Sequence, residues 1–187
     1  MSHFKLPKSA RESFRWFWYQ VATDFNRIVP ANAMALIKAA FCDDFNDPES
    51  PVEHMFVDQI SFDGEKIHGV LSSEPNWIKS VQEGDDVALT LEQVGDWICV
   101  VGEVVYGAFS VQVIRSKMSA DERQAHDDAW GLPFPEIGSN NIPERSEEFE
   151  SMITEHLKNA ISENAQIVTM TDETLRTPLR WWRCRFH

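Results

Sequence analysis

The sequence predicts an α+β fold: a mostly antiparallel sheet of about five to six strands, an N-terminal amphipathic helix and a helical C-terminal extension. Strand-like segments between residues 53 and 116 are joined by short turns, which is typical of antiparallel pairing. Apolar residues recur with helical spacing before this region, over residues 14–28, and after it, over residues 147–163. The 187 residues suffice for one domain plus an extension.

The first predicted element is a helix from about Ala10 to Arg27. Ser9 and Glu12 have the spacing of a capping box, and Pro30 ends the helical pattern. The apolar residues at spacings of three and four are Phe14, Phe17, Trp18, Val21, Phe25 and Ile28. A stripe of this width typically docks on a sheet, so we expect the helix to lie along the sheet with Phe14, Trp18 and Phe25 largely buried.

Residues 53–72 predict a β-hairpin. Two extended runs flank Asp63 and Gly64, the dipeptide of a type I′ turn. A two-residue loop at this position places His68 opposite Gln59. It also separates the two hairpin histidines by several residues along the ladder, so we do not expect them to form a metal-binding pair.

The other segments before residue 133 are assigned from their period and their end signals. They are a helix or strand at 33–41, an acidic loop at 42–51, a short helix from Ser73 to Gly84, strands at 86–92, 97–101 and 108–116, and a helix that begins at Ser119 with Glu122 as its capping-box partner and ends near Trp130-Gly131.

The best candidate boundary is PFPEIGSNNIPERS, residues 133–146, which is rich in Pro, Gly, Ser and Asn. It divides the chain into an α+β domain, residues 1–135, and an extension, residues 136–187, which we expect to pack on the same domain. Residues 147–163 predict one amphipathic helix, followed by a short strand (QIVTM) and a tail. The residues expected to face inward on this helix are Phe149, Met152, Ile153, Leu157, Ala160 and Ile161.

The composition is that of a soluble globular protein, with 43% hydrophobic and 25% charged residues. No run approaches the roughly eighteen apolar residues of a membrane span. The first residues lack the apolar stretch and cleavage site of a secretory signal. Three cysteines without a CxxC spacing fit reduced thiols. We therefore expect a cytoplasmic protein without a membrane span.

The net charge of −13 is unevenly distributed. Residues 31–173 contain twenty-eight acidic and eight basic side chains, whereas residues 174–187 contain four arginines and no acid. An acidic middle repels phosphate backbones, which disfavours nucleic-acid binding, and it would steer a basic partner protein toward the chain. The alternative is that this charge serves solubility alone.

Motifs of common enzyme classes are absent: the sequence has no GxSxG elbow, Walker loop, GxGxxG or HExxH. The remaining candidate for chemistry surrounds AHDDAWGLPFPE, residues 125–136. Glu122 and His126 lie one helical turn apart and could hold a metal ion, whereas Asp127 and Asp128 point away from that face. The alternative is a polar helix end whose following residues cover the core. We expect no cofactor and no metal, and these four residues are the catalytic candidates if the protein is an enzyme.

Two further groups are candidate binding residues. Asp96 and Trp97 either form a turn and a core anchor or line a groove. The tail RTPLRWWRCRF mixes arginines with aromatic residues, which suits an anionic surface, nucleic acid or an aromatic pocket of a partner. The alternative for the tail is an edge strand that pairs its arginines with the acidic middle. Its candidate contacts are Arg180, Trp181, Trp182 and Arg183.

Five stretches in order resemble the bacterial YegJ-like family, also called domain of unknown function 2314. They are ARESFRWFW, EHMFVDQISFDGEKIHGVLSSEPNW, QEGDDVALTLEQVGDWICV, VYGAFSVQVIRSKM and ERQAHDDAWGLPF. The resemblance covers about residues 10–135 and implies a compact α+β bacterial domain with no assigned reaction. The positions it matches, mostly turn formers or core anchors, are Gly69, Pro75, Gly84, Asp85, Asp96, Trp97, Tyr106 and Gly107.

These observations favour a non-enzymatic, acidic protein-interaction module that binds a basic protein. One version is an immunity-type neutraliser of a basic toxin or effector. Its candidate contacts are Asp43, Asp44 and Asp47 in the acidic loop, besides the two groups above. The alternatives are a small hydrolase or metal-dependent enzyme around Glu122 and His126, and a nucleic-acid or membrane binder acting through the tail. The sequence leaves the oligomeric state open.

Overall fold

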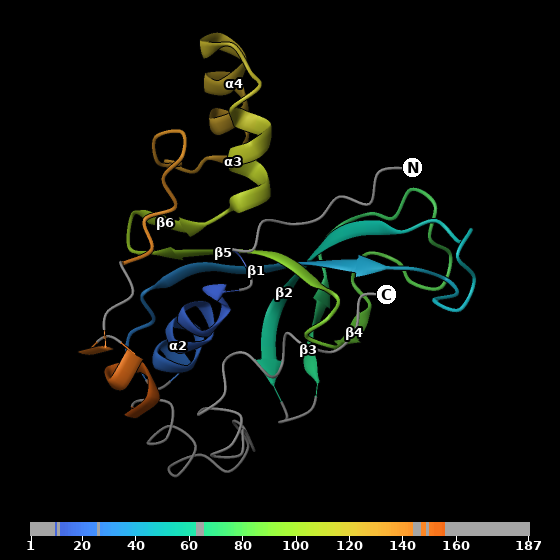
Figure 1. Cartoon of the computed structure of the whole chain (residues 1–187), viewed down its shortest axis with the longest axis horizontal. Coiled ribbons are helices and arrows are strands. Elements are labelled where there is room, and N and C mark those ends of the chain that lie inside the picture. The colour runs from blue at the N-terminus through green and yellow to red at the C-terminus, as the bar shows by residue number, and fades with distance from the viewer. Residues whose placement is uncertain are drawn as a thin grey trace.

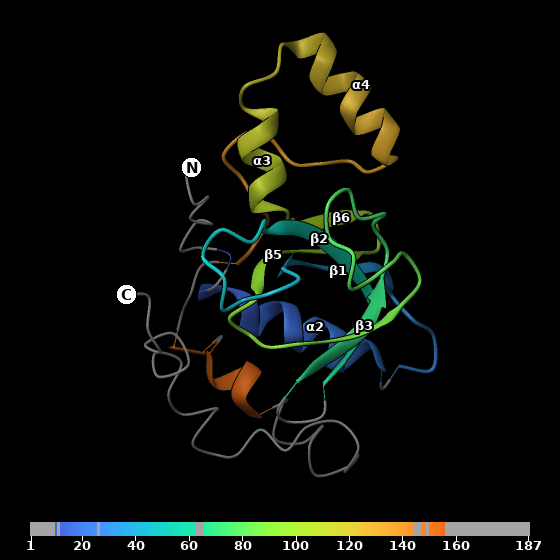
Figure 2. The ribbon, with the colours of Figure 1, turned by 90° about the vertical axis from the view of Figure 1, so that its right-hand side faces the viewer.

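A computed structural model describes residues 10–155, apart from residues 11, 26, 63–65, 144–146 and 149. Within this part, six strands form one sheet. Helix α2 (Phe14–Phe25) lies on one face of the sheet, whereas α3 (Phe109–Arg115) and α4 (Ala120–Trp130) project from the other side (Figure 1 and Figure 2). This arrangement confirms the predicted α+β class.

The strands are β1 (Asn32–Phe41), β2 (Glu53–Phe62), β3 (Ile67–Leu71), β4 (Asp86–Leu89), β5 (Val94–Val101) and β6 (Val104–Gly107). Their order in the sheet is β4-β3-β2-β1-β5-β6. All five pairings between neighbouring strands are antiparallel. Residues 33–41, whose pattern fits either element, are a strand because β1 lies in the centre of the sheet and pairs with β2 and β5. Strand β6 was not predicted from the sequence. No helix in the described ranges is long and apolar enough to cross a membrane.

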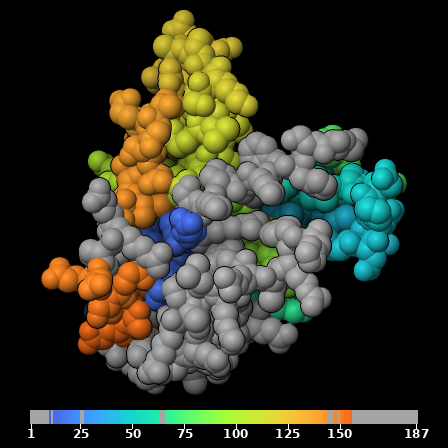
Figure 3. Space-filling view, viewed as in Figure 1, coloured from blue at the N-terminus to red at the C-terminus, as the bar shows by residue number. Residues whose placement is uncertain are grey.

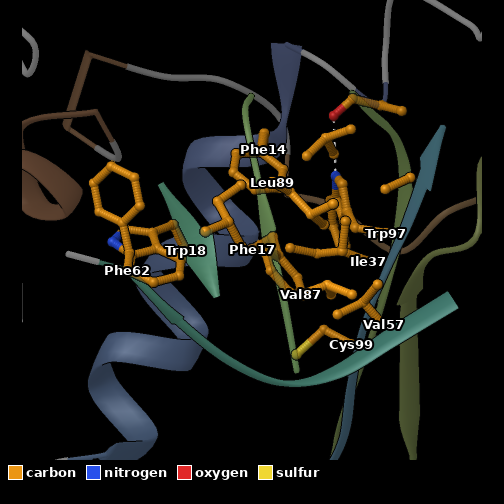
Figure 4. Packing of buried hydrophobic residues seen from close by; sticks show 14 of the residues in the cluster. Phe14, Phe17, Trp18, Ile37, Val57, Phe62, Val87, Leu89, Trp97 and Cys99 are labelled. Carbon is orange, nitrogen blue, oxygen red and sulfur yellow. Dashed lines mark hydrogen bonds between the residues drawn. The ribbon is translucent and has the colours of Figure 1, made fainter. Parts of the chain in front are cut away.

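Helix α2 covers the main core with its aromatic side chains (Figure 4). Phe14 and Trp18 are buried, as predicted, and so is Phe17, which belongs to the same predicted stripe. Trp16, which lies outside the predicted stripe, is also buried. The apolar face of the helix is therefore wider than the predicted stripe. Ile28 was wrongly placed in the stripe: it follows the end of the helix and is fully exposed. Ser9 and the side chain of Phe25 lie outside the described residues.

Replacing Trp18 with alanine is expected to destabilise the protein by about 3 kcal/mol, near the lower end for large core truncations. Trp18 is 5% exposed and packs edge-on against Phe62, with ring centroids 5.4 Å apart. Its indole Nε1 is buried without a hydrogen-bond partner, so truncation also removes an unsatisfied polar group. Urea denaturation measures the loss. Ile28→Ala is the control and should change stability by less than about 0.5 kcal/mol.

The predicted register of the β2–β3 hairpin is wrong. His68 pairs with Ser61 rather than with Gln59, and Phe62 pairs with Ile67, which leaves four residues between the strands. The cause is the length of this connection, because four residues in place of the predicted two shift the pairing at the turn by two positions. Farther from the turn, an irregularity between Asp58 and Ser61, where Gln59 has a positive φ of 51°, shifts the pairing by one residue, so that Val57 pairs with Leu71. The Asp63-Gly64 turn itself lies outside the described residues.

Residues 108–116, predicted as a strand, form α3 instead. The buried carboxylate of Asp96 accepts hydrogen bonds from the backbone N–H groups of Phe109, at 3.1 Å, and Ser110, at 2.5 Å. Ala108 precedes them in a left-handed conformation, with φ 55°. An acceptor thirteen residues away in the chain thus satisfies the first amides of the helix, and the local strand-like pattern is overridden.

Helix α4 begins and ends where the sequence predicts. Ser119 and Glu122 form the complete capping box, and Gly131 ends the helix in the left-handed conformation. The helix has no buried residue of its own. It is attached through a small second core under α3, which contains Ile98, Val100, Val105, Ala108, Val111 and Phe134.

The described part of the C-terminal extension packs against α2. Residues 147–148 and 150–155 are helical. Ile153 is buried in the main core, whereas Met152, predicted to face inward, is 45% exposed. Arg15 of α2 bonds to Glu150, at 2.8 Å, and to Thr154, at 3.0 Å. Phe149, Leu157, Ala160, Ile161 and the QIVTM strand lie outside the described residues, and the division at residue 135 stays a prediction.

Candidate functional site

Two loops meet at one end of the sheet: residues 42–52, between β1 and β2, and residues 72–85, between β3 and β4 (Figure 1). We call them the acidic loop pair, because together they contain seven acidic residues and one lysine. The space-filling view shows the first loop projecting from the body of the protein (Figure 3). The pair therefore offers a negatively charged surface away from the helices.

Two carboxylates from outside the second loop hold its backbone. Glu53, which is 7% exposed, accepts hydrogen bonds from the backbone N–H groups of Asn76, at 3.0 Å, and Trp77, at 3.1 Å. Asp43 accepts from the N–H groups of Lys79, at 3.0 Å, and Ser80, at 2.9 Å. Two side chains thus satisfy four amides within five consecutive residues, and the loop is held in a defined conformation.

These bonds explain why the predicted helix from Ser73 to Gly84 is absent. A helix needs its amides to bond to carbonyls of its own preceding turn. The amides of this loop bond to carboxylates instead, and those charged acceptors form stronger bonds than a neutral carbonyl. The structure accordingly has bends and turns over this segment.

The same hydrogen bonds hold the pKa of both carboxyl groups below their ordinary values. For Asp43, the bonds from Ser80 make the largest contribution. For Glu53, burial raises the pKa, but the bonds from Asn76 and Trp77 outweigh it. Both groups are therefore ionised at neutral pH, where each accepts hydrogen bonds at full strength.

The loop pair exposes large apolar side chains among its carboxylates. Phe45 is 63% exposed, Trp77 is 65% exposed and Val52 is 49% exposed. Ile78, the residue next to Trp77, is 5% exposed and anchors the second loop in the core. Phe45 and Trp77 were not predicted from the sequence as candidate binding residues. The polar neighbours of Trp77 were the available signal, because a core tryptophan usually lies in an apolar pattern.

The three predicted acidic contacts differ in their surroundings. The Asp43 carboxylate is engaged by the second loop, so its first role is structural. Asp44 accepts from the N–H of Asn46, at 2.8 Å, and Asp47 accepts from that of Glu49, at 2.9 Å. These are Asx turns that stiffen the first loop. The residues Asp44 and Asp47 remain exposed and present their charge to solvent.

Asp96 and Trp97 lie inside the protein, 1% and 0% exposed. Asp96 caps α3, and the Trp97 indole donates to the carbonyl of Ala10 at 3.0 Å. These contacts fit the interpretation of Asp96 and Trp97 as structural residues better than the interpretation in which they line a groove. Arg180, Trp181, Trp182 and Arg183 lie outside the described residues, so their predicted role in binding stays a prediction.

Of the four catalytic candidates on α4, the structure brings His126 and Asp127 together, whereas Glu122 and Asp128 bond to other residues. Glu122 bonds to Ser119 as part of the helix cap. His126 Nδ1 lies 2.9 Å from Asp127 Oδ1, and Asp128 bonds to Gln124 at 2.8 Å. No group of three or more His, Cys, Asp or Glu side chains among the described residues is arranged to hold a metal ion. The catalytic or metal-binding role of these residues stays an untested hypothesis.

Asp127 also joins α4 to α3 through a buried arginine. Arg115 is 4% exposed and donates to Asp127 through two nitrogens, at 2.9 and 2.6 Å. Its third nitrogen donates to Gln112 and to the carbonyl of Pro135. The guanidinium is fully paired, as a buried charge must be. This network holds the two helices and the following segment together.

We expect Asp127→Asn to flatten the acid dependence of stability. Burial raises the pKa of Asp127, but Arg115 and His126 outweigh it, so the pKa lies below its ordinary value. Such a group stabilises the fold above its unfolded pKa of about 4 and loses this effect as the pH falls through the folded pKa. Urea midpoints at about pH 5, 4 and 3 should fall less in the variant. Equal slopes for the variant and the unmodified chain would contradict the prediction.

A cavity of about 240 Å³ lies where α2, α3 and the C-terminal extension meet. Arg15, Trp16, Asn140, Glu150 and Ile153 are among its lining residues. Arg15 and Glu150 bond to each other there, so the polar groups of the cavity serve the packing of the extension on α2.

The fold and these sites define a single-sheet α+β domain with an acidic loop pair. The chain belongs to the family described as uncharacterized protein conserved in bacteria (DUF2314), whose model matches residues 5–134. This match confirms the resemblance found in the sequence.

Two curated relatives are similar to the chain. A putative ankyrin repeat protein of Neisseria meningitidis serogroup B is 33% identical over 184 residues, which cover 94% of this chain and 72% of that protein. The uncharacterized protein YegJ of Escherichia coli K12 is 26% identical over 76 residues, which cover 39% of this chain and 50% of that protein. No solved structure matches the chain.

Proposed function

We propose that this chain is a protein-interaction module that binds a basic partner protein through the acidic loop pair. The observation that carries the proposal is the combination of exposed aromatic residues and exposed carboxylates on loops with a held backbone. Phe45 and Trp77 are each more than half exposed, one on each loop, and Asp44 and Asp47 are exposed on the first loop. Aromatic residues are enriched at the centres of protein interfaces, where they contribute most of the binding energy.

The charge of the loop pair supports a basic partner. A surface of one sign attracts a partner of the opposite sign over distances of about a Debye length and raises the association rate. Because Glu53 and Asp43 hold the second loop in place, little conformational entropy is lost when a partner binds. The charge of the loop pair therefore raises the rate of association with a basic partner, and the held backbone raises the affinity for it.

The name of the longer relative also supports protein binding. Ankyrin repeats stack into extended concave surfaces that bind other proteins. The meningococcal relative is described as a putative ankyrin repeat protein, and 28% of its length lies beyond the part that this chain matches. A binding role for the shared part would fit a protein of that class.

Asp44→Asn/Asp47→Asn is expected to slow association with the basic partner about two- to fivefold at low salt, because two charges leave the approach surface. Asparagine keeps the acceptor of each Asx turn, so the loop keeps its conformation. The partner is recovered from the native host with the whole chain as bait, and association rates are measured across salt concentrations.

Glu103→Gln/Glu136→Gln is the matched control for this experiment. It removes the same charge from exposed positions outside the loop pair and should leave the association rate nearly unchanged. The proposal fails if the recovered partner is acidic, if its association rate ignores salt, or if both double variants slow it equally.

In a finer version of the proposal the partner is a basic toxin or effector, and the chain neutralises it in the cytoplasm. The free thiols of Cys42 and Cys99 fit a reducing compartment. Expression of the recovered partner in the host with and without this chain tests this version. Growth arrest that the chain relieves would support it, and a partner harmless on its own would rule it out.

A further inference from the structure

We infer that Trp77 is the anchor of the acidic loop pair and that it receives an arginine side chain of the partner. This inference rests on the proposed function, because it names the contact by which the proposed partner binds. Three features of the molecule support it: the held position of the ring, the absence of a partner for the ring within the described chain, and the charge around it.

The backbone on both sides of Trp77 is held in place. Its own N–H donates to Glu53 Oε2 at 3.1 Å, and the preceding Asn76 donates to the same carboxylate through its backbone and its side chain. The following Ile78 is buried in the core. Since Ile78 fills the position beneath the loop, the indole cannot turn inward without breaking these bonds. The ring stays at the surface, 65% exposed.

Trp77 differs in this respect from the other tryptophans that the structure describes. Trp16, Trp18 and Trp97 are each at most 5% exposed, and each packs against other rings. Trp130 packs against Phe56 and Phe134. Within the described residues, the ring of Trp77 has neither an aromatic nor a cationic partner, although Lys79 lies two residues away. The exposed ring of Trp77 is therefore a candidate for contact with an external group.

The surroundings of the ring favour a cation. The face of an indole attracts positive charge, and tryptophan is the best of the aromatic residues for this contact. The loop pair adds seven carboxylate residues against one lysine, so a cation over the ring also meets an attractive field. An apolar or acidic side chain would gain from the ring but not from the charge.

Arginine suits this position better than lysine. The guanidinium is planar, so it stacks on the indole while its N–H groups, in the same plane, donate to nearby carboxylates. It is also more weakly hydrated than an ammonium group and loses less on leaving water. A lysine at the same position keeps the charge but lacks the stacking and the in-plane donors.

The test uses the full chain and two synthetic peptides of equal length and charge, one with arginines and one with lysines spaced by glycine. We expect the arginine peptide to bind about two- to fivefold more tightly, as a cation–π contact at an exposed site provides. It should also shift the indole N–H resonance of Trp77, assigned by its loss in Trp77→Ala. Trp77→Ala should bind both peptides equally, and Trp77→Phe should keep part of the preference.

Ile114→Ala is the control, since it removes a large side chain, 46% exposed, from outside the acidic loop pair and should leave the preference for arginine intact. Equal binding of the two peptides to the unmodified chain would overturn the inference, as would a preference that survives Trp77→Ala. If both peptides bind equally but lose affinity in Asp44→Asn/Asp47→Asn, the proposed function stands and only the role of Trp77 fails. If neither peptide binds, the inference fails as well.

Discussion

Asp96→Ala is expected to destabilise the protein by about 3–5 kcal/mol, because it leaves several buried amides without an acceptor. The carboxylate accepts from the N–H groups of Trp97, Phe109 and Ser110, at 2.7, 3.1 and 2.5 Å. The side chain is 1% exposed, so water cannot replace it. Without this acceptor the first turn of α3 loses its cap, and the second core under α3 loses its support. Urea denaturation at neutral pH measures the loss.

Asp96→Asn separates the hydrogen bonds from the charge. The amide oxygen still accepts, but the amide nitrogen cannot, so we expect roughly half the loss of the alanine variant. Burial raises the pKa of Asp96 despite the hydrogen bonds from Ser110 and its neighbours. A carboxyl with a raised pKa in the folded state makes stability fall as the pH rises from the unfolded to the folded pKa. The asparagine variant should lack this fall, and an alanine variant as stable as the parent would contradict the assignment of Asp96 as the cap.

Trp97→Ala is expected to cost about 4–5 kcal/mol, at the upper end for an aromatic truncation. Trp97 is 0% exposed, and its ring packs against Trp16 at 5.8 Å and Phe17 at 5.4 Å. Unlike Trp18, it also makes a hydrogen bond, to the carbonyl of Ala10. Truncation therefore leaves a large cavity and also removes a buried hydrogen bond.

The control for Trp97→Ala is Trp77→Ala, which removes the same side chain from the surface. The exposed position should change the free energy of unfolding by less than about 0.5 kcal/mol. Similar losses for the two variants would contradict the placement of Trp97 in the core and of Trp77 on the surface. The expected result for Trp77→Ala would also establish that Trp77 can be removed for binding experiments without unfolding the chain.

The acidic loop pair shows which parts of the candidate site can be predicted from the sequence and which cannot. The cluster at Asp43, Asp44 and Asp47 was recognised from composition alone, because charge density is a property of the chain that needs no fold. The structural role of Asp43 could not be recognised from composition, because its hydrogen-bond partners Lys79 and Ser80 lie thirty-six and thirty-seven residues away. Trp77 was missed for the same reason: its exposure depends on the carboxylate of Glu53, twenty-four residues away.

By itself the sequence determined the α+β class, the amphipathic helix α2 and both ends of α4. These features depend on periodicity and on signals within one or two turns, such as the Ser119–Glu122 capping box and the glycine that follows the helix. Only the tertiary structure decided that residues 108–116 are a helix and that the segment after β3 is not. In both places, distant carboxylates accept the backbone hydrogen bonds that local propensity would have directed elsewhere. A buried or charged acceptor contributes more than the few tenths of a kcal/mol per residue by which local preferences differ, so the long-range contact prevails.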